Sequence, residues 1–300
     1  MFNFIAVQLG KFLHLIYNTI AFQNYGLSII FFTILVRILL LPLAVKQYRS
    51  LAKTQEIQPK LEELKKRYKN DKDKLNQEMI KLYQENNINP AGGCMPLLIQ
   101  MPILISLYWV ISSPLKYMFG KTDEIINKLY EFVVQNADVA EKVGRMKDIS
   151  IINFFNNNPD QIQNVSDMIT KSEIPDLSFL GINLGLNPTL SWSSLTGPLA
   201  GQYIILLLIP ILAAATTYLS TRISTVRTNQ AAQGTKGAKA GDAQMQMQGM
   251  TLIMPFMTAF FAFNVPAGLG LYWIASNLFQ IFQQLYMNKF VIKKKEEVSK

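Results

Sequence analysis

Cysteine and histidine are almost absent from this chain of 300 residues: Cys94 is the only cysteine and His14 is the only histidine. An intramolecular disulfide is therefore excluded, and so is a metal site built from Cys and His ligands. Glycine-rich phosphate-binding loops and dinucleotide-binding fingerprints are also missing. We therefore expect a protein that is not an enzyme, with no catalytic residues, no cofactor and no bound metal.

Charged residues are scarce as well, at 16% of the chain, whereas a soluble domain carries about 25%. Half of the residues are hydrophobic, and a run of about 20 of them can cross a hydrocarbon core of about 30 Å as a helix. Five such runs occur, at residues 26–45, 94–116, 202–220, 250–265 and 266–287. The sequence thus predicts an all-α membrane protein with five transmembrane helices. The fourth helix, at about 24 Å, is short enough to thin the bilayer locally.

The basic residues predict how the chain is oriented. Twenty of the 29 Lys and Arg residues lie in three alternate segments, at residues 46–93, 221–249 and 288–300. Basic loops stay on the cytoplasmic side of a membrane. We therefore expect a multi-pass protein of the bacterial plasma membrane, with the N-terminus outside and the C-terminus, a basic tail, in the cytoplasm.

Residues 1–25 are apolar but interrupted by polar side chains. Lys11, His14 and Asn18 recur at spacings of three and four and would form one polar helix face, with Phe4, Leu15 and Phe22 on the other side. This pattern predicts an amphipathic helix lying in the outer membrane interface. An additional membrane span is the alternative.

Residues 46–93 predict a cytoplasmic helical hairpin. Pro59 is suited to the first turn of a helix, and Asn70 to Asp73 predict a turn. Two apolar stripes flank this turn, Leu61, Leu64 and Tyr68 before it and Leu75, Met79 and Leu82 after it. Two amphipathic helices joined by a turn would pack as an antiparallel pair, whereas the alternative is a solvated, charged coil.

The external segment, residues 117–201, predicts short helices, one of which starts at Thr122 with acidic residues in its first turn. Its Asn-rich stretch, 153–158, predicts a loop, and the segment contains no recognisable chemistry. The cytoplasmic loop at 221–249 is rich in Gly, Ala, Gln and Thr between Thr228 and Asp242, which predicts flexibility.

Polar residues inside the predicted spans mark a candidate site. Arg37 lies within the first span, where a charge costs about 2.5–3.5 kcal/mol, and no Asp or Glu lies in any span to pair with it. Thr33 is one turn earlier on the same helix face. The last span carries a polar and aromatic stripe formed by Trp273, Asn277, Gln280 and Gln284. The second span adds the side-chain amide of Gln100. Together they predict a hydrated groove.

Three sequence stretches resemble the YidC family of membrane protein insertases. They are GGCMPLLIQMPI from Gly92, TILVRILLLPL from Thr33 and GLYWIASNLFQIFQQ from Gly270. The resemblance covers all five predicted spans and the hairpin, and it is to a short form without a large external domain. It implies a groove that contains Arg37, Thr33 and Gln100, with Tyr272 and Trp273 contacting the substrate.

The resemblance also implies a function. A member of this family receives hydrophobic segments of nascent proteins in a positively charged groove and releases them sideways into the bilayer. Its partners would be nascent membrane proteins and the lipid bilayer, with the ribosome and the Sec translocon as further candidates. We expect no small-molecule substrate.

Other interpretations of the same residues remain open. Arg37 could bond helix-end carbonyls, Gln100 and Asn277 could join helices, and Trp273 could be ordinary packing. A methionine-rich stripe in the fourth span, Met250, Met254, Met257 and Phe261, is more typical of packing than of a substrate surface. Two rival functions are a transporter or anion channel, which predicts an internal repeat that the sequence lacks, and a structural membrane scaffold.

Overall fold

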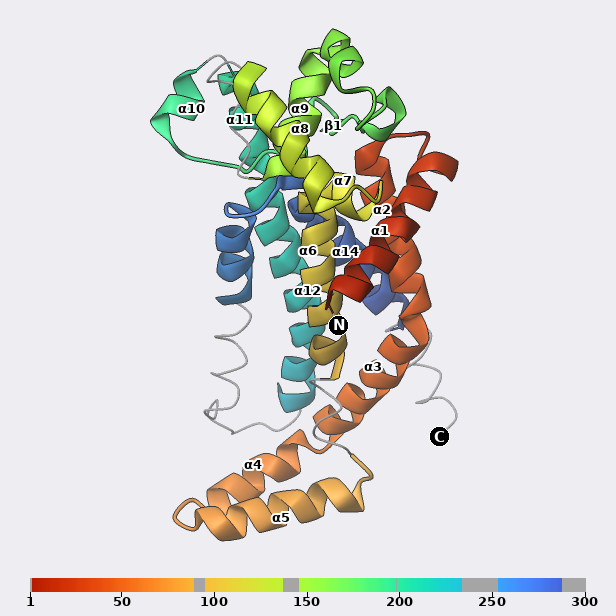
Figure 1. Ribbon diagram of the computed structural model, residues 1–300. Helices are drawn as coiled ribbons and strands as arrows, with labels where there is room; N and C mark the ends of the chain where they lie inside the picture. The colour runs from red at the N-terminus through yellow and green to blue at the C-terminus, as the bar shows by residue number, and fades with distance from the viewer. Residues whose placement is uncertain (1, 89–94, 137–145, 198, 234–252, 288–300) are drawn as a thin grey trace.

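The computed structural model describes residues 2–88, 95–136, 146–197, 199–233 and 253–287. These residues are mostly helical, in agreement with the predicted all-α class. Figure 1 shows a bundle of long helices in the middle, a group of short helices above it and a pair of helices below it. The two-stranded sheet in the described residues is small, and pairs β1 (Ser178–Phe179) with β2 (Ile182–Asn183) in antiparallel orientation.

The bundle consists of five long helices. They are α1 (Phe2–Thr19), α2 (Tyr25–Leu39), α6 (Met95–Ser112), α12 (Leu208–Gln233) and α14 (Ala267–Met287). Helix α14 contacts α2, α6 and α12, while α1 lies against α2 and α6. Glycines allow close approach, because a Cβ at Gly270 of α14 would lie 2.2 Å from a methyl carbon of Ile209 on α12.

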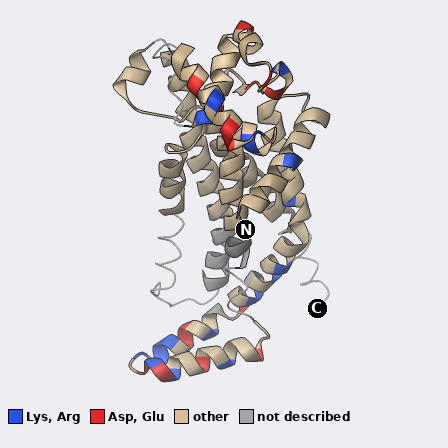
Figure 2. Ribbon diagram, in the orientation of Figure 1, with Lys and Arg blue, Asp and Glu red and all other residues tan. Residues whose placement is uncertain are grey.

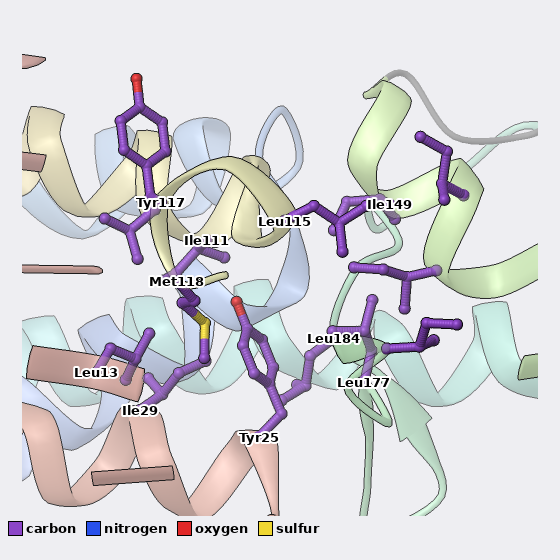
Figure 3. Close-up of a cluster of buried hydrophobic side chains, with 14 of the residues drawn as sticks. Leu13, Tyr25, Ile29, Ile111, Leu115, Tyr117, Met118, Ile149, Leu177 and Leu184 are labelled. Carbon is purple, nitrogen blue, oxygen red and sulfur yellow. The ribbon is translucent and has the colours of Figure 1, made fainter. Parts of the chain in front are cut away.

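The main hydrophobic core joins the bundle to the short helices above it. Figure 3 shows side chains from distant parts of the chain that meet there, among them Leu13, Ile29, Ile111 and Leu184. All four are fully or almost fully buried. Burial of these apolar side chains fixes the position of the short helices relative to the bundle.

The first predicted span is not one straight helix. Asn24 caps α2 by accepting a hydrogen bond from the Leu27 N–H, and α2 ends at Leu39. The chain continues as α3 (Leu41–Glu56) at an angle of 56°. Pro42 explains the bend, because proline cannot donate a backbone hydrogen bond to the preceding turn and its ring clashes there. The expectation of one continuous helix over residues 26–45 is therefore corrected, while its role as the first membrane span stays a prediction.

In the described residues, length and apolarity alone identify fewer than five membrane-spanning helices. In the described residues, Ala200–Ile223 meets both criteria in one helix, and the bent pair Tyr25–Leu39 and Leu41–Ser50 meets them together. The apolar stretches Gln100–Ser112 and Ile253–Ala262 are shorter. Helix α14 has 21 residues, but the amide and hydroxyl groups along it lower its mean hydropathy. The five-span topology therefore stays a prediction.

Helix α1 packs against the bundle through one face. Its buried residues are Ala6, Gly10, Leu13, Ile16 and Tyr17. The apolar side chains named in the sequence prediction are exposed, at 69% for Phe4, 58% for Leu15 and 84% for Phe22, which lies in the turn after the helix, and their contact with the membrane interface stays a prediction. The helix uses small and aliphatic residues for the close contact with the bundle, which leaves these larger apolar side chains outside it.

Below the bundle, α4 (Gln58–Arg67) and α5 (Lys72–Glu85) lie against each other and run in opposite directions (Figure 1). Pro59 lies in the first turn of α4, as predicted, and Asp71 caps α5 by accepting from the Lys74 N–H at 3.0 Å. A small separate core holds the pair together, made by Ile57, Leu61 and Ile88 with Met79, Leu82 and Tyr83. Many Lys, Arg, Asp and Glu residues lie along the two helices (Figure 2), and most of them are exposed.

The described residues between 114 and 206 form short elements above the bundle (Figure 1). The elements there are α7 (Pro114–Tyr117), α8 (Asp123–Asn136), α9 (Lys147–Asn157), η2 (Pro159–Val165), η3 (Lys171–Glu173), α10 (Trp192–Thr196) and α11 (Ala200–Leu206). Thr122 precedes α8 and accepts from the Ile125 N–H, in agreement with the predicted helix start. The loop expected at 153–158 is wrong, because residues up to Asn157 belong to α9, where burial of Phe154 and Phe155 outweighs the low helix propensity of asparagine.

Two other predicted segments change. Helix α12 runs to Gln233, so the part of the 221–249 loop that the structure describes is helical rather than flexible. Residues 234–252 and the basic tail from 288 lie outside the described residues, as does Cys94.

Candidate functional site

Arg37 lies at the end of α2, close to the bend that separates it from α3. It occupies the last turn of that helix, three residues before the bend at Leu40. A positive charge at a helix C-terminus interacts favourably with the helix dipole. The side chain is half-buried, and none of the ion pairs within the described ranges involves it. The helix end therefore reduces the cost of placing this charge among apolar helices.

Ser276 on α14 is the hydrogen-bond partner of Arg37. The Nε of Arg37 donates to the Ser276 hydroxyl oxygen at 3.1 Å, and Nη2 donates to the same oxygen. Ser276 is 3% exposed. A neutral oxygen orients the guanidinium without neutralising it, so the positive charge remains available for an anionic group.

A second polar contact lies one turn away on the same helix. Gln100 of α6 donates from Nε2 to the Tyr272 hydroxyl at 2.7 Å. Tyr272 precedes Ser276 by four residues, so the two side chains share a face of α14. The two contacts connect α2, α14 and α6 through polar groups, and they bring Arg37, Gln100 and Tyr272 to one region, as the resemblance implies.

Thr33 is placed differently from the expectation. It lies on the same helix as Arg37, but it is fully buried, and its hydroxyl donates to the Ile29 carbonyl at 2.6 Å. This bond to its own helix uses the donor proton of Thr33. Whether Thr33 contacts a substrate stays a prediction.

The polar stripe expected along the last span divides between two neighbours. Asn277 does not face Arg37: its Nδ2 donates to the hydroxyl oxygens of Thr216 at 3.2 Å and Thr217 at 2.8 Å, both on α12. The Thr217 hydroxyl in turn lies 3.5 Å from that of Thr258 in the helix Ile253–Ala262. Asn277 therefore joins helices, one of the two interpretations that the sequence left open.

The other members of the stripe surround these contacts. Trp273 is half-buried and packs against the main core, Gln280 is half-buried and Gln284 is buried. In the helix Ile253–Ala262, Met254 and Met257 are exposed by 40% and 48%. Their role in packing or in substrate contact therefore stays a prediction, and Met250 lies outside the described residues.

Sequence reasoning missed the partners of the predicted residues. Ser276 is four residues from Tyr272, and this helical spacing could have placed it on the Arg37 side of α14. Thr216 and Thr217 gave no comparable signal, because threonine pairs are common in membrane helices. Within the described ranges, no group of three or more His, Cys, Asp or Glu side chains could hold a metal ion. The chemistry that these groups offer is hydrogen bonding and a positive charge.

The bundle and its polar contacts define the class: a helical integral membrane protein with a cationic group among its helices. The family model of the 60Kd inner membrane protein matches residues 15–295, and the chain belongs to that family. Relatives named membrane protein insertase YidC are similar over most of the chain. The protein of Clostridium perfringens is 33% identical over 265 residues, which cover 88% of this chain and 78% of the relative.

Two further relatives carry the same name. The protein of Caldanaerobacter subterraneus is 30% identical over 280 residues, covering 93% of this chain and 92% of the relative. The protein of Histophilus somni is 50% identical over 106 residues, which cover 35% of this chain and 19% of the relative. The resemblance inferred from the three sequence stretches is therefore confirmed at the level of the family.

Proposed function

We propose that this protein is a membrane protein insertase that receives hydrophobic segments of nascent proteins and releases them into the bilayer. Its membership of the 60Kd inner membrane protein family, whose relatives are named insertases, supports the proposal. The single structural observation that carries the mechanism is the half-buried guanidinium of Arg37, bonded to Ser276 and without an acidic partner in the described residues.

In this mechanism Arg37 attracts acidic residues that flank the apolar segment of a client. A charge in a partly desolvated position acts over a longer distance than the same charge in water. Thr33, Gln100, Tyr272, Trp273, Asn277, Gln280 and Gln284 line or support a groove that keeps the polar flank hydrated. The apolar segment leaves sideways, and its burial in lipid drives insertion at about 0.8 kcal/mol per CH₂ group.

The helices α4 and α5 would receive clients on the cytoplasmic side. Their charged outer surface (Figure 2) and their attachment to the bundle through α3 support this role. The partners in this proposal are nascent membrane proteins and lipids, with the ribosome and the Sec translocon as further candidates. The topology is five spans in the bacterial plasma membrane, with the N-terminus outside and the C-terminus in the cytoplasm.

The decisive experiment compares two clients that differ only in whether acidic residues flank the apolar segment. Arg37→Ala should abolish most insertion of the acidic client and affect the neutral client less. Arg37→Lys should retain much of the activity, because lysine keeps the charge and loses only the geometry of the guanidinium. Lys11→Ala, which removes an exposed charge from α1, is the matched control and should behave as the wild type.

Insertion is measured as protease protection of the client in proteoliposomes. Equal loss on both clients in Arg37→Ala would contradict the electrostatic mechanism, because it would mean that Arg37 supports the bundle. Normal insertion of both clients would remove Arg37 from the mechanism altogether.

A further inference from the structure

A cavity of about 420 Å³ lies where α6 ends, away from Arg37. Residues of α6, α7, α8 and α9 line it, including Trp109, Lys116, Tyr117, Lys147 and Asp148. These helices surround the junction between the bundle and the short helices above it (Figure 1). The size is in the range of about 300–1,000 Å³ that small-ligand sites occupy.

The charged groups in the cavity are two cations and two carboxylates. Lys116 Nζ lies 2.6 Å from the Asp123 carboxylate, and Lys147 Nζ donates to Asn127 at 2.7 Å. Asp148 is 4% exposed and accepts the backbone N–H of Lys116 at 3.1 Å. Two positive and two negative groups in one small cavity give it no net charge, and they offer both cationic donors and anionic acceptors to a ligand.

Apolar and aromatic side chains adjoin these charges. Trp109 and Tyr117 line the cavity, and Phe2 of α1 lies edge-on against Trp109, with ring centroids 6.4 Å apart. Phe2 is 38% exposed, so the apolar surface continues out of the cavity along the bundle. Aromatic side chains of this kind concentrate at the level of lipid headgroups. Polar groups over an exposed apolar surface match a phospholipid, in which a polar headgroup is attached to acyl chains.

We propose that this cavity binds the headgroup of an amine-bearing zwitterionic phospholipid, with the phosphate at Lys116 and Lys147 and the ammonium at Asp123 and Asp148. An anionic headgroup would be repelled by the two carboxylates and would offer them no cationic partner. A lone cation would meet two ammonium groups. A zwitterion satisfies both kinds of group at once, which gives selectivity by charge complementarity.

The existing contacts do not prevent this binding. The ion pair between Lys116 and Asp123 is exposed, at 34% and 73% of the two side chains, and exposed pairs contribute little stability. Lys147 is exposed and bonded to a neutral amide. Both lysines can therefore turn to a phosphate at small cost. The proposal does not depend on Arg37 or on insertase activity.

The test uses the full-length protein in nanodiscs that contain equal amounts of phosphatidylethanolamine and phosphatidylglycerol. Native mass spectrometry then counts the lipids that remain bound after the disc is released. We expect preferential retention of one phosphatidylethanolamine. Lys147→Gln should lower that retention about tenfold, as expected for the loss of one charge-assisted hydrogen bond. Asp123→Asn should reduce the preference for phosphatidylethanolamine over phosphatidylglycerol.

Lys128→Gln is the matched control, because Lys128 is on the same helix as Asp123 and pairs with Glu124 on the exposed surface. It should retain lipid as the wild type does. Competition separates a headgroup from a free anion: phosphoethanolamine should displace the lipid, and inorganic phosphate should not. Equal retention of the two lipids, displacement by inorganic phosphate, or unchanged retention in Lys147→Gln would each overturn the proposal. Lys147 is on the surface, so its substitution leaves folding intact, which circular dichroism can verify.

Discussion

The Arg37 guanidinium and the Ser276 hydroxyl, 239 positions apart in the chain, form a direct contact between α2 and α14. Ser276 uses a neutral oxygen to hold a cation, and the charge of Arg37 therefore stays uncompensated within the described residues. A carboxylate at position 276 would hold the arginine more firmly but would neutralise it. The serine thus orders the Arg37 side chain and leaves its positive charge available to another group.

Substitution of Ser276 should separate these two properties. Ser276→Ala leaves Arg37 without its hydroxyl partner, and a hydrogen bond to a charged group contributes about 1.5–3 kcal/mol. We expect lower thermal stability in detergent and reduced insertion of acidic clients. Ser276→Thr keeps the hydroxyl and should restore most of both. An alanine variant with unchanged stability and insertion would show that the contact has no functional weight.

Gly10 should be intolerant of a side chain. A Cβ there would lie 2.2 Å from the backbone carbonyl oxygen of Tyr117, so α1 and α7 would have to separate. Gly10→Ala should therefore lower the melting temperature and loosen α1, measured by hydrogen exchange. The control is Gly201→Ala on α11, where no atom lies within 4 Å of the added carbon. Because alanine favours a helix over glycine by about 1 kcal/mol, this control should be neutral or stabilising.

Asp148 predicts a pH dependence of stability. Burial raises the pKa of this carboxyl from 3.8 to about 6, against the lowering effect of backbone hydrogen bonds from Lys116 and Leu115. The folded state therefore binds the proton more readily than the unfolded chain, and stability rises as the pH falls from 7.5 towards 5. Asp148→Asn carries no titrating group and should remove this part of the dependence.

The measurement is the difference in melting temperature between the wild type and Asp148→Asn at each pH, because this difference cancels the other titrating groups. The variant should be the more stable of the two at pH 7.5, and its advantage should shrink towards pH 5. A difference that does not change with pH would contradict the assignment.

The predicted topology can be tested by labelling single cysteines in a background that lacks Cys94. Positions Lys72, Gly237 and Lys295 should react with an impermeant reagent only from the cytoplasmic side, because the basic segments that contain them stay there. Asn156 should react only from outside. A reversed position would refute the five-span orientation.

Local signals predicted the parts of the fold that depend on single residues. Pro59 marked the start of α4 and Thr122 the start of α8, whereas Asp71, the cap of α5, was predicted only as part of a turn. Where tertiary contacts override propensity, prediction failed: the asparagines near 155 are helical because the phenylalanines between them enter the core. Pro42 was visible in the sequence, but the bend that it produces was not inferred.

The sequence predicted the positive charge of the candidate site but not the hydrogen bonds that its residues make. One arginine in an apolar run is conspicuous, and it identified Arg37. A serine in a membrane helix is ordinary, so Ser276 carried no signal of its own. The direction of Asn277 depends on the rotation of α14 relative to α12, which the packing of the two helices determines, including the close contact of Gly270 with Ile209. Periodicity gives the face of a helix but not the neighbour that the face meets.

The bend at Leu40 links the position of α3 to the last turn of α2. This helix has 16 residues and is therefore about 24 Å long, with the pair α4 and α5 at its far end and Arg37 three residues before its pivot. A partner that binds to α4 and α5 would act on the bend through the full length of α3. A small tilt of α3 would then change the direction of the last turn of α2. In the proposed mechanism, binding of a partner to α4 and α5 would therefore change the position of the Arg37 guanidinium without contacting it.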